Sequence, residues 1–193
     1  MFVKLIAIAT VCGAVYGQES KPVIDNERVT VWDVTGTAGR TDLAGRDSGV
    51  VVLGVVVLWL TGAKARTASF QEDPGDGRRL VIALKDHAVA PIENKTGYPA
   101  AFPRPHVKKL LENDRVVAWS YRWNPGEPTP MHFHDKDVVV VYLEPTALIS
   151  TTPDGAKTLN EYKAFDVRFN KGNRTHTEAL AHGSGSAMML ELK

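Results

Sequence analysis

The apolar residues of this chain come in short runs of β-branched and aromatic side chains, and each run ends near a Gly, Pro, Asn or Asp. Such runs are typical of short β-strands separated by turns. The strands predicted in this way cover residues 28–34, 50–60, 80–84, 115–123, 138–144 and 187–192. Only residues 104–113 suggest a helical turn, and longer segments with the helical period are otherwise absent. A βαβ layout is therefore disfavoured, and the pattern predicts an all-β barrel or sandwich.

The N-terminus has the pattern of a signal peptide over residues 1–17. Lys4 supplies a positive charge, residues 5–15 are apolar, and small side chains precede Gln18. The apolar run is too short to span a bilayer. We therefore expect a periplasmic or secreted protein that has no membrane segment after cleavage. Cys12 is the only cysteine, so the mature chain would contain neither a disulfide nor a thiol nucleophile.

The charged residues are balanced, with 23 Lys and Arg against 22 Asp and Glu, and no long run of one sign occurs. A nucleic-acid-binding domain usually concentrates basic residues on one face or stripe. We therefore expect no nucleic-acid partner.

Two parts of the chain resemble each other at a nearly constant offset. Residues 23–29 resemble residues 110–116 at an offset of 87, and Trp32 and Trp119 keep the same offset. Further along, residues 50–52 match residues 138–140 at an offset of 88, and His87 matches His176 at an offset of 89. These matches predict two copies of one β unit joined by the Pro-rich stretch at 98–105. We assign residues 18–104 to a first copy and residues 105–193 to a second.

The strongest chemical signal is a histidine pair that follows a segment rich in Pro and Gly. The segment begins at Asn124 and contains Gly126, and His132 and His134 follow it. On a β-strand, residues two apart point to the same face, with backbones separated by about 6.6 Å. Two such imidazoles can converge on one metal ion, but stable binding needs a third ligand.

A second segment can supply that ligand. Gly172 marks a turn, and His176 and Glu178 follow it on one face of a predicted strand. If this strand pairs with the first one, His176 reaches the same ion. The sequence thus predicts a centre of His132, His134 and His176, with Glu178 beside it.

The two segments resemble the two metal motifs of the cupin superfamily. Gly126, His132 and His134 match the first motif at its spacing, and Gly172 with His176 matches part of the second. The resemblance implies a jelly-roll β-barrel with an internal divalent metal, typically Fe, Mn, Zn, Ni or Cu. It implies that the first copy is a degenerate cupin without metal ligands, because Ala44 and Arg46 stand where His132 and His134 would be.

The chain departs from the first motif at its glutamate. That glutamate would fall at Val138 or Val139, and Asp137 is one residue early. A strand without a bulge would turn Asp137 away from the histidine face. Glu178 is the other carboxylate available, as a fourth ligand, as a partner that orients a histidine, or as a general base.

Several other side chains are weaker candidates. His106 and His182 fall in a predicted linker and a Gly/Ser turn, where exposure is expected. Trp119, Tyr121 and Trp123 alternate along one strand and suit core packing or the mouth of the barrel. Three arginines are candidates for contact with an anionic substrate, although such residues are usually solvated; they are Arg122, Arg168 and Arg174.

Three functions remain open from the sequence. The first is an exported metalloenzyme that acts on a small organic molecule, by oxygen activation or by Lewis-acid catalysis. The second is a module that binds a small ligand or a metal without catalysis, which the missing glutamate favours. The third is a dimer-forming scaffold. A homodimer suits all three, because small barrels often shield their sheet edges by association.

Overall fold

A computed structural model describes residues 21–34, 48–53, 56–61, 64–68 and 79–193 of the chain. All regular secondary structure in these residues is β-strand, so the predicted all-β class is confirmed. Within the described residues, no helix is long and apolar enough to cross a membrane. The predicted signal peptide at 1–17 and the residues Ala44 and Arg46 lie outside the described residues.

The C-terminal half consists of two antiparallel sheets. The five-stranded sheet has the order β13-β10-β15-β8-β7, and the four-stranded sheet has the order β12-β11-β14-β9. The strands of the first sheet are β7 (Val107–Glu112), β8 (Val116–Arg122), β10 (Val138–Tyr142), β13 (Val167–Asn170) and β15 (Ser186–Leu192). Those of the second are β9 (His132–His134), β11 (Thr146–Thr151), β12 (Lys157–Tyr162) and β14 (Arg174–Gly183).

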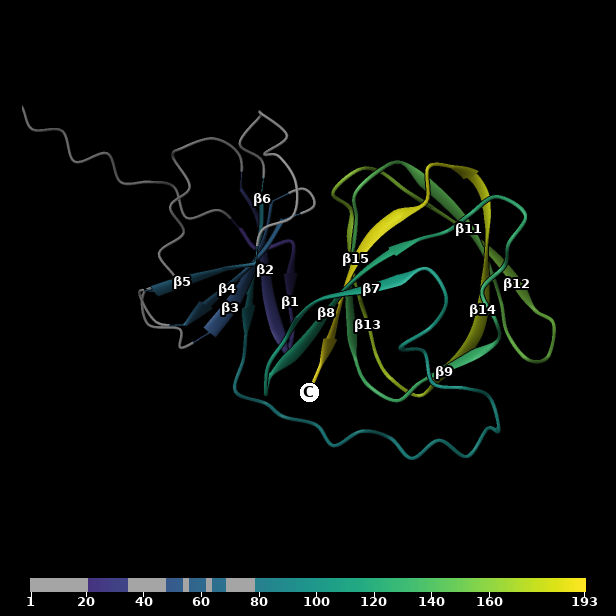
Figure 1. Cartoon of the computed structure of the whole chain (residues 1–193), viewed down its shortest axis with the longest axis horizontal. Coiled ribbons are helices and arrows are strands. Elements are labelled where there is room, and N and C mark those ends of the chain that lie inside the picture. Colours follow the sequence, from purple (N-terminus) through teal and green to yellow (C-terminus); the bar gives the residue numbers. More distant parts are fainter. Residues whose placement is uncertain (1–20, 35–47, 54–55, 62–63, 69–78) are drawn as a thin grey trace, which may run out of the picture.

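The order of these strands is that of a jelly roll. Two chain segments wind together, so that β8 pairs with β15 and β10 with β13 in one sheet. In the other sheet β9 pairs with β14 and β11 with β12. From β8 to β11, and again from β12 to β15, successive strands therefore alternate between the two sheets, which face each other around a shared interior (Figure 1). This is the two-sheet jelly-roll architecture expected of cupins.

The described strands of the N-terminal half form one six-stranded sheet of order β1-β2-β6-β3-β4-β5. Its strands are β1 (Ile24–Asp25), β2 (Val29–Val34), β3 (Ser48–Leu53), β4 (Val56–Thr61), β5 (Lys64–Ala68) and β6 (Arg79–Leu84). The order β1-β2-β6-β3 matches the order β7-β8-β15-β10 in the second half, which supports the repeat inferred from the sequence. His87 follows β6, whose place matches that of β15, so His87 and His176, which lies on β14, do not occupy equivalent positions.

The five-stranded sheet is the middle one of three layers. On β10, Val139 and Val141 face the N-terminal sheet and pack with residues such as Val31 and Ile82. Val138 and Val140 face the interior of the jelly roll. Because both faces are covered, this strand is apolar at every position instead of alternating, and all its residues are buried.

Two predicted elements are wrong. The stretch 50–60 is not one strand but parts of two, β3 and β4, which pair antiparallel with each other. Residues 104–113, where a helical turn was expected, contain β7, which pairs with β8 through a register shift. The alternation along β7 is masked by this irregularity, and the apolar positions then fall at helix-like spacing.

Between β6 and β7 the chain runs along the jelly roll towards β9 (Figure 1). Residues 99–101 lie beside β9, where the Phe133 amide donates to Pro99 O and the Ala101 amide donates to Phe133 O, both at 2.8 Å. This segment then turns inward, which buries Phe102 and Arg104. A stretch predicted only as a linker therefore contributes to the interior of the barrel.

Candidate metal centre

The sequence around β9 fixes the first two histidines. Prolines at 125, 128 and 130 keep the approach to β9 out of the regular ladder, since proline has no amide hydrogen. Thr129 nevertheless attaches this approach to β14: its amide donates to Glu178 O at 2.9 Å, and its hydroxyl accepts from the Glu178 amide at 2.8 Å. His132 and His134 then point inward from the short strand that follows, as their spacing predicts.

The pairing of β9 with β14 brings in the third histidine. His176 lies directly opposite His132, and Arg174 lies opposite His134. The turn before β14 packs closely, because a Cβ at Gly172 would lie 3.1 Å from the backbone of Lys136. A glycine at this position thus allows the turn to settle against the β9–β10 connection.

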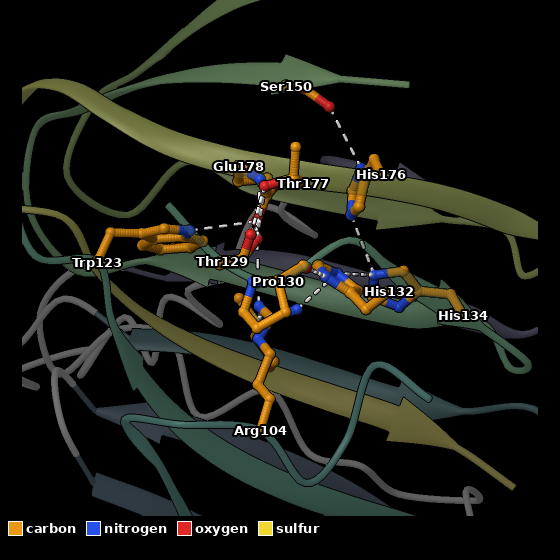
Figure 2. A network of polar contacts seen from close by, with 11 residues as sticks. Arg104, Trp123, Thr129, Pro130, His132, His134, Ser150, His176, Thr177 and Glu178 are labelled. Carbon is orange, nitrogen blue, oxygen red and sulfur yellow. Dashed lines mark hydrogen bonds and ion pairs between the residues drawn. The ribbon is translucent and has the colours of Figure 1, made fainter. Parts of the chain in front are cut away.

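The three imidazoles converge inside the barrel (Figure 2). Nε2 of His134 lies 3.2 Å from Nε2 of His132 and 3.2 Å from Nε2 of His176. A tetrahedral ion bound at about 2.0–2.1 Å would hold its nitrogen ligands about 3.3–3.4 Å apart. The observed separations fit a divalent metal without rearrangement of the strands.

In two of the rings, the contacts of Nδ1 are consistent with metal binding through Nε2. Nδ1 of His132 lies 2.8 Å from Pro130 O, an acceptor that requires a proton on Nδ1 and leaves the lone pair on Nε2. Nδ1 of His176 lies 3.3 Å from the Ser150 hydroxyl. Nδ1 of His134 is buried without a partner. Contacts to Nδ1 therefore orient two of the three imidazoles, those of His132 and His176.

All three histidines are held in the neutral form that coordinates metals. Burial lowers the pKa of His132 to about 3, with a further contribution from the Arg104 guanidinium. Burial also lowers the pKa of His176 to about 3, assisted by Arg174 and Arg104. For His134, burial and the two neighbouring histidines hold the pKa far below its ordinary value. At neutral pH a cation would therefore displace no proton from these rings.

Two of the histidines, His134 and His176, border a cavity of about 140 Å³. The cavity is lined by polar and aromatic side chains from both sheets, among them Ser150, Asn160, Tyr142 and Tyr162. The two tyrosine rings are stacked with centroids 3.6 Å apart. A small molecule bound in this space would reach the histidine centre.

Glu178 lines the same cavity, as its place two residues after His176 predicts. Its carboxylate accepts from Trp123 Nε1 at 3.2 Å and pairs with Arg104 Nη2 at 3.9 Å (Figure 2). These contacts hold it beside the histidine cluster, whose ligand atoms all lie within 4.8 Å of one another. The arrangement suits a neighbouring acid or base better than a fourth ligand.

Asp137 points away from the histidines, as the strand alternation predicts. One carboxylate oxygen accepts from the Gly172 amide at 2.8 Å, and the other pairs with Arg28 at 3.2 Å. Arg28 is buried and also donates to Lys193 O. Asp137 thus fastens the turn before β14 to the N-terminal sheet.

The remaining candidates divide as their positions suggest. His106 and His182 are about half and two-thirds exposed, and each pairs with a surface glutamate. Of the three arginines, Arg174 lines the cavity, whereas Arg122 and Arg168 are exposed. The aromatic residues of β8 and of the turn after it pack in the interior cluster; they are Trp119, Tyr121 and Trp123.

Arg104 is the site residue that the sequence did not reveal. Its guanidinium Nη1 lies 2.6 Å from Nε2 of His132, and its carbon lies 4.4 Å from the Tyr121 ring centroid. It precedes β7 by three residues, in a stretch that reads as linker. The closest signal was the run of aromatic and proline residues around Phe102, which is unusual for a solvated connection.

No family model and no curated protein matches the chain. Among solved structures, it is similar to a cupin domain from Bordetella pertussis at 22% identity and a TM-score of 0.41, over 50% of this chain and 96% of that one. It is also similar to an RmlC-like cupin family protein from Methanocaldococcus jannaschii at 13% identity and a TM-score of 0.38, over 54% and 90% of the two chains. A polyketide cyclase from Streptomyces resistomycificus matches at 20% identity and a TM-score of 0.37, over 54% and 79%.

The pairing of β7 to β15 alone gives the strand order of the two facing sheets. The histidine pair of β9 and the histidine of β14 face the space between those sheets. Residues 107–193 therefore have the cupin fold that the two histidine motifs predict, with a cluster of three histidines inside it that could hold a divalent metal.

Proposed function

We propose that this chain is an exported cupin-type metalloenzyme that acts on a small organic molecule. His132, His134 and His176 hold the metal, and Glu178 transfers protons beside it. The observation that carries the proposal is the convergence of three neutral imidazoles, two of which line a cavity that also contains a carboxylate.

A divalent metal on three histidines keeps coordination positions for a substrate or water and supplies Lewis-acid or redox chemistry, according to its identity. The protein's own groups then orient the reactants. Trp123 and Arg104 hold the Glu178 carboxylate in place, so it can accept or return a proton at the reacting molecule. Tyr142 and Tyr162 form a flat wall against which an organic body can pack.

The test is turnover of a panel of small organic molecules by protein stripped with a chelator and reloaded separately with Fe(II), Mn, Zn, Ni or Cu. We expect activity with at least one metal and loss of metal and activity together in His132→Ala. In Glu178→Gln we expect the metal to stay and the rate to fall about 10²–10⁴-fold, the usual contribution of a positioned acid or base. His182→Ala, on the surface, is the matched control. Full activity in metal-free protein would contradict the proposal.

The second candidate is a module that binds a ligand without catalysis. Val138 lines the cavity close to where the family motif has its glutamate, so the carboxylate of that motif is missing. Such a module would show no turnover on any panel member while a bound ligand raised its thermal stability.

Export rests on the residues at 1–17 alone. Mass spectrometry of protein recovered from the periplasm or medium of a bacterial host should show Gln18 as the first residue. Full-length chain that stays in the cytoplasm of a host with a working export system would contradict this part of the proposal.

A further inference from the structure

The cavity beside the three histidines has an excess of positive charge. Among the described residues, the charged side chains that line it are Arg104, Arg174 and Glu178. Two guanidinium groups and one carboxylate leave one net positive charge. The histidines add none at neutral pH, and a divalent ion would raise the total to three.

The burial of Arg104 is unfavourable in free energy unless an anion binds beside it. Its side chain is only 4% exposed, and its Nε is buried with no hydrogen-bond partner. Its ion pair with Glu178 is long at 3.9 Å, and the neighbouring Tyr121 side chain is neutral. A buried cation that is incompletely paired is expensive, so such groups are kept where they meet an anion.

The contact between Arg104 and His132 would be lost when a metal binds. Nη1 donates to the Nε2 lone pair at 2.6 Å, and a metal on Nε2 would use that same lone pair. When the metal binds, the guanidinium loses this acceptor. It then faces the cavity beside the metal with Glu178 as its remaining charged neighbour. An anion in the cavity would replace the lost acceptor.

Arg174 approaches from the other strand of the β9–β14 pair. It lies opposite His134 in the register and lines the same cavity as Arg104. Its Nε donates to Lys171 O at 2.8 Å, which leaves its two terminal nitrogens for other partners. The two arginines thus reach the cavity from different segments, residues 99–106 and β14.

The size and the lining of the cavity favour an organic anion over an inorganic one. A dry cavity of about 150 Å³ holds a molecule of about benzene size, or roughly six heavy atoms. The cavity here, at about 140 Å³, has a wall of stacked tyrosines that suits an organic body. The guanidinium groups of Arg104 and Arg174 also line it, and guanidinium groups match the planar fork of a carboxylate.

We propose that Arg104 and Arg174 bind the carboxylate of a small organic acid, which is the substrate of the histidine centre. This inference rests on the proposed function for the role of the metal. The carboxylate takes the place that His132 now occupies as acceptor for Arg104, and the rest of the molecule packs against Tyr142 and Tyr162. Neutral molecules of the same shape bind poorly, because they leave the guanidinium groups unpaired.

The probes are oxamate and oxamide, which have the same shape and differ by one negative charge. Isothermal titration calorimetry on the full mature protein loaded with Zn²⁺ compares their affinities. We expect oxamate to bind at least about tenfold more tightly than oxamide, as charge-assisted hydrogen bonds predict. The preference should disappear in Arg104→Met while the Zn²⁺ content, measured in the same sample, stays unchanged.

Arg122→Met is the matched control, because Arg122 lies outside the cavity and is 59% exposed. Arg174→Met should also weaken oxamate at least about tenfold, and it provides the test if Arg104→Met does not fold. Equal binding of the two probes by the wild-type protein, or an oxamate affinity unchanged in both variants, would overturn the inference. Failure to bind Zn²⁺ would instead overturn the proposed function, and the comparison of oxamate with oxamide on metal-free protein would still test the arginine pair.

Discussion

The imidazoles of His132, His134 and His176 are neutral in the folded protein, and their surroundings explain why. Each ring is at most 8% exposed and lies near Arg104 or Arg174, so a proton on it would be both desolvated and repelled. In the unfolded chain the same rings are solvated and protonate at their ordinary pKa of 6.5. Folding therefore removes protons from them in mildly acidic solution.

This difference predicts acid sensitivity of the metal-free protein. The folded-state pKa of His132 and His176 is depressed, so the unfolded state binds more protons than the folded state between about pH 6.5 and pH 3. Stability should be complete above pH 6.5 and fall as the pH drops, by roughly 1.4 kcal/mol per pH unit for each histidine. Urea unfolding at pH 7.5, 6 and 5 measures this. The slope should be smaller in His176→Asn and unchanged in His182→Ala; a stability that is flat from pH 7.5 to 5 would contradict the account.

The pair of Asp137 and Arg28 shows what the sequence could and could not predict at this scale. Strand alternation correctly turned Asp137 away from the histidines. Its partner lies 109 positions earlier in the chain, and no local pattern links the two. The sequence did not predict Arg104 as a site residue for the same reason, since its burial depends on where residues 99–101 dock and not on its own neighbours in sequence.

At the scale of elements, the short strands were predictable because turn residues bound them. The β2, β6, β8, β10 and β15 strands fall within a few residues of their predicted bounds. The sequence predicts neither of the edge strands β12 and β13, and it predicts only the part of β14 around His176 and Glu178. Polar side chains interrupt the apolar pattern of these strands where one face meets solvent. The sequence predicts β3 and β4 as one strand because the residues between them include no Asn or Asp, which usually mark a turn.

The corner at the end of β14 requires a glycine at position 183. The chain passes there from the four-stranded to the five-stranded sheet, and Gly183 has a φ of +91°. A Cβ on Gly183 would collide with the carbonyl oxygen of Pro145. Gly155 has a similar φ of +86°, but its Cβ would meet nothing within 4 Å.

We expect Gly155→Ala to lower the free energy of unfolding by about 1–3 kcal/mol, the cost of the positive φ alone. Gly183→Ala should cost at least about 1–3 kcal/mol more, because the backbone must also move. Urea unfolding of the two variants gives the difference directly. Equal losses would show that the contact with Pro145 is not a constraint.

At the scale of the whole molecule, the N-terminal sheet covers the outer face of the jelly roll. Fully buried residues of β2 and β6, such as Val31 and Ile82, share one core with β8, β10 and β15. The shared strand order β1-β2-β6-β3 and β7-β8-β15-β10 was hinted at by the 87-residue offset. The face-to-face packing of the two sheets was not, because a repeat in sequence does not say how its copies meet.

Because the core is shared, a cavity in the N-terminal sheet should loosen the jelly roll. Ile82→Ala should lower the free energy of unfolding by about 2–5 kcal/mol, as deletion of a buried aliphatic side chain usually does. Hydrogen exchange followed by mass spectrometry should show faster exchange in β8 and β10 as well as in β6. Val23→Ala, at a position that is 53% exposed, is the control. Exchange that rises only in β6 would contradict a shared core.

The central claim is that three histidines from β9 and β14 bind one metal ion. The direct measurement is metal content by plasma mass spectrometry on untagged mature protein purified without chelators, beside His132→Ala, His176→Ala and His182→Ala. We predict nearly one divalent ion per chain in the wild type and in His182→Ala, and its loss in the other two variants. A wild-type protein that holds no metal, even after anaerobic reconstitution, would contradict the claim.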